Sequence, residues 1–295
     1  MNLLTAIRRA ASQLRAAGVF VAHNADNALD EARTLALHAV DLPANWPGNL
    51  SGAALSIVEQ DRIDALIERR IRERIPAAYL IGRAEFAGLS FACDTRALVP
   101  RSPIAELIET GFDGWCDASR VERALDLCCG GGSIGIAMAV HQPRWQVDLA
   151  DISPQALALA QTNIERHGVG DRVRAIASDM FNGLKGNHYQ LIVSNPPYVT
   201  EAEFAALAPE YSFEPALGLV SGYDGLDATA RIVAEACDYL RPGGLLIVEI
   251  GEAWRAFKRR FPDLPVAWIP FSVGHMGVFA ITREALIAHR GTGHE

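Results

Sequence analysis

The sequence predicts an α/β fold, in which a doubly wound parallel sheet follows a small helical domain. From about residue 121, apolar runs of strand length alternate with runs of helical character, as expected for parallel strands with helices on both faces. Glycines lie where the first of these strands would turn into a helix. Before residue 78, in contrast, the apolar residues recur with helical spacing.

Residues 1–78 are predicted to form the helical domain, interpreted as a substrate-docking piece. Three apolar stripes with helical spacing span residues 3–14, 29–40 and 63–75. Each is followed by residues that end helices, namely Gly18, then Pro43 and Pro47, then Pro76. The third stripe also carries a charged run from Glu68 to Arg74, interpreted as a solvated helix face.

Residues 79–100 are predicted to form a β-hairpin linker. Apolar residues alternate at Leu89, Phe91 and Cys93 after a turn at Gly88, which is typical of a hairpin strand. The remaining segment, residues 101–295, would form the sheet domain. It opens with a short proline-bracketed stretch that contains Arg101 and Ser102, whose role the sequence leaves open.

Within 101–295, the elements are predicted from length and apolar pattern. Strands are expected at residues 124–129, 145–151, 173–180, 189–194, 243–251 and 277–282. Helices are expected at residues 104–112, 133–141, 154–168 and 228–240. The last residues, 289–295, are expected to be disordered. Parallel sheets bind ligands at the carboxyl ends of their strands, near the point where the strand order reverses.

Composition and charge exclude several classes of protein. The chain has 27 basic and 35 acidic residues, a formal charge of −8, which argues against a binder of nucleic-acid backbone. Five cysteines form no C-x-x-C pair, and the eight histidines are scattered, so no metal site is expected. No apolar run reaches the ~18 residues of a membrane span, and the N-terminus does not resemble a signal peptide. The expectation is a cytoplasmic protein.

A glycine-rich turn predicts a cofactor site. Gly130, Gly132 and Gly135 follow the strand that contains Asp126, with the G-x-G-x-x-G spacing of dinucleotide-binding turns. Asp151 ends the next strand, near the ~20-residue offset of a carboxylate that binds ribose hydroxyls. These features fit an adenosine-containing cofactor without identifying it, and a plain strand–helix turn remains an alternative.

A second motif, Ser194-Asn195-Pro196-Pro197-Tyr198, follows an apolar strand. Here the sequence resembles the N-P-P-Y amino-methyltransferases that use S-adenosyl-L-methionine (AdoMet) and have a Rossmann-like class I fold. The resemblance implies methylation of a planar nitrogen. The Asn195 side-chain oxygen and the Pro196 carbonyl would accept the two N–H groups of the target, and Tyr198 would supply a flat wall.

The stretches PAAYLIGRAEFAGLSFACDTRALVPRSPIAELI and EPALGLVSGYDGLDATARIV narrow this resemblance. They resemble the HemK/Prm protein-glutamine methyltransferases over about residues 76–282. This family modifies side-chain amides of glutamine. The R-S-P-I segment and Cys128 resemble the branch whose substrate is the large-subunit ribosomal protein L-three. The branch that modifies peptide chain release factors remains an alternative.

The resemblance also implies the site residues and makes residues 101–295 the methyltransferase domain. The methionine end of AdoMet would be held by Asp126, Cys128, Cys129, Gly130, Gly131 and Gly132. Asp151, with Ile152 beside it, would hold the ribose, and Asp179 would face the adenine amine between Met180 and Phe181. The substrate amide would be held by the catalytic loop Asn195, Pro196, Pro197 and Tyr198, and Asn195 would also contact the cofactor.

Other classes explain the motifs less completely. A nicotinamide dehydrogenase would explain the glycines and Asp151 but not the Asn195–Tyr198 loop. A nucleobase amino-methyltransferase would explain that loop, but it should also bring a basic recognition region. A non-catalytic cofactor-binding scaffold would not need the loop intact. The expected partner is therefore a protein, with no sequence-specific nucleic acid and no membrane.

Overall fold

A computed structural model describes the chain except for residues 22–26, 45, 47–51, 53, 273 and 293–295. Four helices precede the first strand, namely α1 (Leu3–Ala16), α2 (Ala28–Ala39), α3 (Ile57–Glu73) and α4 (Ala77–Ile81). The three predicted helices are confirmed and α4 is additional, whereas Pro47 lies outside the described residues. Leu14, Leu35 and Ile63 are almost fully buried and belong to the core that α1, α2 and α3 share.

The helix ends follow local side-chain chemistry. The Asn2 side chain accepts a hydrogen bond from the backbone of Thr5, and Ser56 forms a capping box with Glu59 at the start of α3. Helix α3 ends at Glu73 because Arg74 adopts a left-handed conformation, with φ 61°. The helix therefore stops before Pro76, the residue that was expected to end it.

A two-stranded antiparallel hairpin links the helical region to the main sheet. Strands β1 (Arg83–Phe86) and β2 (Leu89–Ala92) pair around Ala87 and Gly88, which both have positive φ, 46° and 72°. Two residues of positive φ twist a hairpin turn to match its strands, so the predicted hairpin is confirmed. Helix α5 (Ile104–Glu109) follows it.

The main sheet has seven strands in the order β5-β4-β3-β6-β7-β9-β8. Their bounds are β3 (Arg123–Leu127), β4 (Gln146–Asp151), β5 (Val173–Ala177), β6 (Tyr189–Ser194), β7 (Leu240–Glu249), β8 (Ala267–Phe271) and β9 (Gly274–Thr282). The first five strands in this order are parallel. The predicted parallel sheet is confirmed for these five strands, whereas β9 near the other edge runs antiparallel to both β7 and β8.

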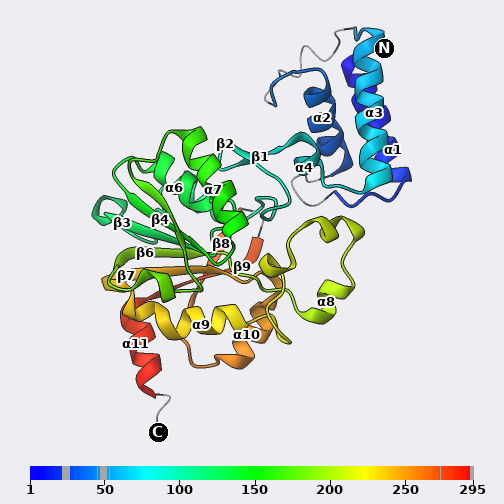
Figure 1. The fold of residues 1–295 in the computed structure, drawn as a ribbon. Coiled ribbons are helices and arrows are strands. Elements are labelled where there is room, and N and C mark those ends of the chain that lie inside the picture. The colour runs from blue at the N-terminus through cyan, green and yellow to red at the C-terminus, as the bar shows by residue number, and fades with distance from the viewer. Residues whose placement is uncertain (22–26, 45, 47–51, 53, 273, 293–295) are drawn as a thin grey trace.

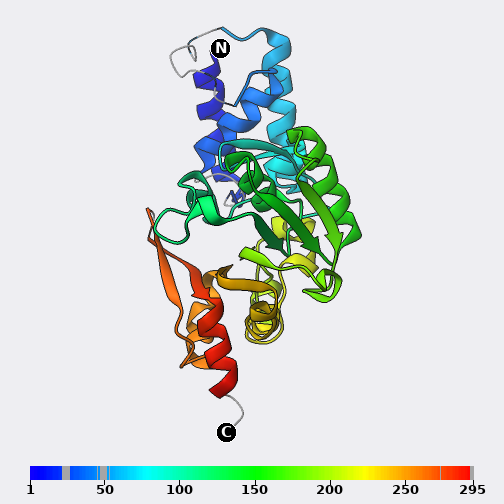
Figure 2. The same ribbon diagram turned by 90° about the vertical axis from the view of Figure 1, so that its left-hand side faces the viewer.

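Helices cover both faces of this sheet (Figures 1 and 2). Helices α6 (Ser133–His141) and α7 (Pro154–His167) cover one face together with α5. Helices α9 (Asp227–Glu235), α10 (Trp254–Arg260) and α11 (Arg283–Thr292) cover the other. Successive residues of β7 enter opposite cores, Ile247 one and Val248 the other, so the sheet is buried on both sides. Because α11 includes residues 289–292, the expectation of disorder is wrong there, and residues 293–295 lie outside the described residues.

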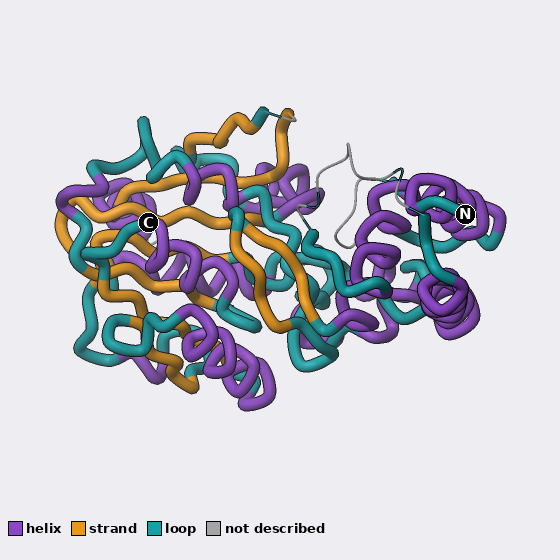
Figure 3. Tube along the Cα trace, turned by 90° about the horizontal axis from the view of Figure 1, so that it is seen from above, coloured by secondary structure: helices purple, strands orange, loops and turns teal. Residues whose placement is uncertain are grey.

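The switch in strand order positions the site. The chain reaches the edge at β5 and returns to pair β6 with β3 in the middle, which creates a crevice at the carboxyl ends of β3 and β6. A segment with α8 (Glu201–Ala205) and a 3₁₀ turn at Pro209–Phe213 follows β6. Seen from above, the helical region lies at one end of the molecule, beside the sheet domain (Figure 3).

Candidate functional site

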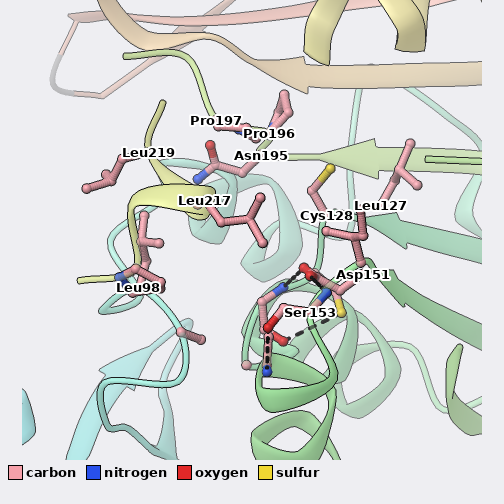
Figure 4. Close-up of a pocket in the computed structure, with 18 of the residues that line it drawn as sticks. Leu98, Leu127, Cys128, Asp151, Ser153, Asn195, Pro196, Pro197, Leu217 and Leu219 are labelled. Atoms are coloured by element: carbon pink, nitrogen blue, oxygen red, sulfur yellow. Dashed lines mark hydrogen bonds between the residues drawn. The ribbon is translucent and has the colours of Figure 1, made fainter. Parts of the chain in front are cut away.

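A cavity of about 430 Å³ opens at the carboxyl ends of β3, β4 and β6 (Figure 4). Most of the sequence-predicted residues line it, namely Cys128, Cys129, Gly130, Gly131, Asp151, Ile152, Asp179, Met180, Asn195, Pro196, Pro197 and Tyr198. Asp126, Gly132 and Phe181 are not among its lining residues. The fold thus brings the glycine turn and the N-P-P-Y loop to one cavity, although about 60 residues separate them in the sequence.

The glycine turn needs unusual backbone conformations and close packing. Cys128, Gly130 and Gly132 all have positive φ, at 61°, 54° and 80°. A Cβ added at Gly135 would lie 2.1 Å from Leu149 Cδ2. Only glycine lets α6 approach the sheet so closely.

Asp126 lies beneath this turn and is fully buried. Its Oδ2 accepts a hydrogen bond from the Gly135 backbone N–H at 2.8 Å. Its Oδ1 is buried without a hydrogen-bond partner among the described residues. Burial raises the pKa of Asp126 to about 8. The carboxyl group therefore anchors the start of α6 through Oδ2, and its other oxygen carries the proton at neutral pH.

Asp151 joins the end of β4 to the glycine turn. Its Oδ2 accepts from the Gly130 backbone N–H at 2.8 Å, and its Oδ1 accepts from the Ser153 N–H at 2.9 Å (Figure 4). Burial raises the pKa of Asp151. A carboxylate has about four acceptor positions, so these bonds leave Asp151 able to accept from a ligand in the cavity.

The segment after β5 divides between the cavity and the core. Asp179 forms an ion pair with Arg231 at 2.7 Å, and Met180 approaches Cys128, with 3.9 Å between their sulfur atoms. Phe181 is fully buried and stacks on Tyr239, with ring centroids 4.5 Å apart. The structure therefore corrects the expectation that Phe181 flanks an adenine, because its ring packs in the core instead of lining the cavity.

The N-P-P-Y loop starts directly at the end of β6. The Ser194 hydroxyl donates to the Leu127 carbonyl oxygen at 2.7 Å and joins this strand end to β3. The Asn195 side-chain amide extends toward the segment that carries Leu217 and Leu219 (Figure 4). A half-buried amide at the cavity wall can accept hydrogen bonds from a bound –NH₂ group.

Sequence reasoning missed the wall opposite this loop. It is formed by residues from the linker and from the segment after β6, including Leu98, Leu207, Tyr211, Leu217 and Leu219. Isolated leucines in irregular segments carry no periodic signal, so the sequence alone could not single them out.

Arg101 and Glu214 join these two wall segments. The guanidinium group donates from Nη1 and Nη2 to the two oxygens of Glu214, at 2.5 and 2.7 Å. The Val99 N–H also donates to Glu214, at 3.1 Å. Bidentate pairing fixes both position and orientation, so the pair holds the linker against the segment after β6.

Glu249, the last residue of β7, was also missed. The carboxylate is 4% exposed and accepts from the hydroxyl of Tyr198 at 3.1 Å. It also accepts from the Ser102 hydroxyl at 2.5 Å. Burial raises the pKa of Glu249 to about 7. A single glutamate at a strand end has no sequence motif of its own.

The described part of the chain contains neither a candidate metal site nor a candidate membrane-spanning helix. No group of three or more histidine, cysteine, aspartate or glutamate side chains there could hold a metal ion. No helix within the same residues is long and apolar enough to cross a membrane.

Comparisons with known proteins agree with this architecture. A family model described as the PrmC N-terminal domain matches residues 5–82, and one described as the methyltransferase small domain matches residues 116–215. The hMettl16 catalytic domain, solved in complex with MAT2A 3′UTR hairpin 1, has a TM-score of 0.54 at 16% identity. It covers 84% of this chain and 90% of its own. This neighbour supports the predicted class I methyltransferase fold alone.

Sequence relatives are much closer. A protein of Xanthomonas campestris named ribosomal protein uL3 glutamine methyltransferase is 50% identical, over 98% of this chain and 93% of its own. A protein of the same name from Neisseria gonorrhoeae is 44% identical, over 95% of this chain and 94% of its own. The predicted resemblance to protein-glutamine methyltransferases is thereby confirmed. The chain belongs to the family of the ribosomal protein uL3 glutamine methyltransferases.

Proposed function

We propose that this protein transfers a methyl group from AdoMet to the side-chain amide nitrogen of a glutamine in ribosomal protein uL3. The observation that carries the proposal is the shared cavity, where Asn195 and Pro196 face the same space as the glycine turn and Asp151. Relatives named for this activity at 43–50% identity support the choice of substrate.

The described residues fit AdoMet. The turn from Cys128 to Gly131 presents backbone to the cavity at a helix N-terminus, where a ligand carboxylate is favoured. Asp126 lies beneath the cavity with its Oδ1 buried and without a described partner, and the cationic methionine end of the cofactor would favour its ionised form. Asp151 keeps acceptor positions for ribose hydroxyls. Asp179, although paired with Arg231, lines the cavity together with Met180 and would face the adenine.

The proposed role of the loop follows from amide chemistry. An amide nitrogen is a poor nucleophile because its lone pair is delocalised into the carbonyl, the resonance that also restricts C–N rotation. When bound, AdoMet supplies a methyl group already activated on a sulfonium sulfur. The loop must therefore place the nitrogen rather than deprotonate it strongly. Asn195 Oδ1 and the Pro196 carbonyl would each accept one N–H and support the positive charge that develops there. The methylated nitrogen would then lose its extra proton to water, and S-adenosyl-L-homocysteine would leave as the other product.

The rest of the molecule would serve the protein substrate. The helical region would dock the ribosomal protein beside the cavity. The net charge of −8 would attract a basic partner electrostatically, and no sequence-specific contact with nucleic acid is needed. We propose a cytoplasmic reaction, because a ribosomal protein would be the substrate.

Methyl transfer from radiolabelled AdoMet tests the proposal. Purified uL3, a peptide chain release factor and unmethylated DNA are offered in parallel, and the label is located by mass spectrometry. We expect label on one glutamine of uL3. Label on the release factor alone would support glutamine methylation but contradict uL3 as the substrate. Label on DNA alone would contradict both glutamine methylation and the uL3 substrate.

A further inference from the structure

Glu249 connects the substrate loop to the linker before α5. Strands β6 and β7 pair in register with Ser194 opposite Val248, so Glu249 lies beside the first residue of the loop. Its two carboxylate oxygens accept one hydroxyl each, Oε1 from Tyr198 and Oε2 from Ser102. These bonds tie together two segments that are far apart in the sequence.

Both donors have little freedom to turn elsewhere. The Ser102 Oγ also accepts from the Ile104 N–H at 3.2 Å, which helps to orient its O–H toward Glu249. Tyr198 is packed closely on Gly251, where an added Cβ would lie 2.7 Å from the ring. The ionised carboxylate, which only accepts, takes the protons of both hydroxyls. A carboxylic acid would donate to one hydroxyl and leave that hydroxyl's own proton without this acceptor.

We propose that Glu249 is a positioning residue for methyl transfer, and that its ionised carboxylate fixes the Asn195-Pro196 acceptors by holding Tyr198 and Ser102 together. This inference rests on the proposed function of the loop. Tyr198 is three residues from Asn195 in the same rigid, proline-containing segment, so a displaced phenol would move the acceptors. A misplacement of about 1 Å can cost 10²-fold in rate.

The surroundings of Glu249 make this arrangement sensitive to pH. Burial opposes its ionisation, whereas Ser102, Tyr198 and the more distant Arg101 favour it. Arg101 is bonded bidentately to Glu214, and β9 places Val278 opposite Glu249 in the register. The resulting pKa is about 7. The positioned loop should therefore form as pH rises through neutrality and be lost below it.

The rate of uL3 methylation at saturating AdoMet, measured between about pH 5.5 and pH 8.5, tests this inference. For the unaltered protein, kcat should rise with pH with a midpoint near 7, the pKa of Glu249. Glu249→Gln should remove that rise and lower kcat about tenfold or more at pH 8. The Kd of S-adenosyl-L-homocysteine should change less than about twofold, because Glu249 is not among the cavity-lining residues.

Ser102→Ala provides a directional test. Removing a hydroxyl that donates to a carboxylate disfavours the charged form, so the midpoint should move to higher pH. The matched control is Tyr189→Phe, since Tyr189 donates to buried Asp148 at 2.8 Å from the start of β6. That substitution removes a similar phenol–carboxylate bond away from the cavity and should leave the midpoint unchanged.

Two results would overturn the inference. The first is that Glu249→Gln keeps the wild-type midpoint of kcat against pH. The second is that the Ser102→Ala midpoint stays the same or moves to lower pH. Infrared spectroscopy supplies a readout besides activity, since the protonated-carboxyl absorption that titrates near pH 7 should be missing from Glu249→Gln, whereas that of Asp126, whose pKa is about 8, should remain. If the unaltered protein methylates neither uL3 nor release factor, the proposed function fails, while the infrared titration still decides whether Glu249 ionises between its two partners.

Discussion

Two side chains in the cavity are assigned separable tasks, Asn195 on the substrate side and Asp151 on the cofactor side. Asn195→Ala removes one acceptor for the target amide, so kcat for uL3 should fall about 10²-fold or more. The Kd of S-adenosyl-L-homocysteine should stay within about twofold, because the glycine turn is untouched.

Asp151→Ala should have the opposite effect and chiefly weaken the binding of the cofactor. Calorimetric titration and single-turnover rates measure both effects, and normal turnover in Asn195→Ala would refute its role.

Among the individual site residues, sequence analysis predicted those that belong to contiguous motifs and missed those that do not. The glycine turn and the Asn195–Tyr198 loop both line the cavity because each is a local turn at a strand end. Phe181 was misplaced because the sequence does not reveal which face of a turn enters the core. Glu249 could not be found, because its importance depends on contacts with Ser102 and Tyr198 across the fold.

Among the secondary-structure elements, the unit formed by β3, the glycine turn and α6 depends on the close approach of α6 to the sheet at Gly135. Gly135 lies in α6, where an added Cβ would be 2.1 Å from Leu149 Cδ2 and 2.9 Å from Asp126 Cβ. Gly135→Ala should therefore overpack the interface and destabilise the protein by about 1–3 kcal/mol. Thermal unfolding measures this as a lower Tm.

Gly291 in α11 is the matched control for Gly135. An added Cβ there meets no atom within 4 Å, and alanine favours helix over glycine. Gly291→Ala should leave Tm unchanged or raise it slightly. Equal Tm values for both variants would contradict the packing argument.

Most elements were predictable because their periods are clear, and the failures have physical causes. Strand β8 was not predicted, because it is short and contains Pro270, which weakens the sequence signal for a strand. The charged run at the end of α3 was interpreted as a solvated face, yet Arg70 is fully buried. Helical spacing shows which residues share a face, but it does not show that a second segment covers that face.

For the whole molecule, buried charges join the helical region to the cavity wall. Arg70 donates to Glu31 of α2 at 2.9 Å and to Glu210, in the segment after β6, at 3.3 Å. Arg74 also reaches Glu210, at 3.4 Å. The next residue, Tyr211, lines the cavity beneath Arg101. A substrate docked on the helical region would thus contact a body that is fixed to the wall of the site.

Arg70→Met tests this connection, because it removes the positive charge that pairs with the buried carboxylates of Glu31 and Glu210. Breaking a buried pair from one side costs about 3–5 kcal/mol. Glu31 should suffer most, since Arg70 lowers a pKa that burial raises. Without Arg70 that pKa rises further, and a raised folded-state pKa costs stability as pH increases. The loss should therefore be larger at pH 8 than at pH 5, as measured by calorimetric unfolding.

Two further variants distinguish this ion cluster from a general effect of the helix. Arg72→Met changes the same helix, but that side chain is 66% exposed, so its effect should be under about 1 kcal/mol. Adding Glu31→Gln to Arg70→Met removes the stranded charge and should recover much of the loss, with a weaker pH dependence. If Arg70→Met were no less stable than Arg72→Met, the cluster would not be what holds the helical region against the wall of the site. If its loss did not grow with pH, Glu31 would not be the stranded charge.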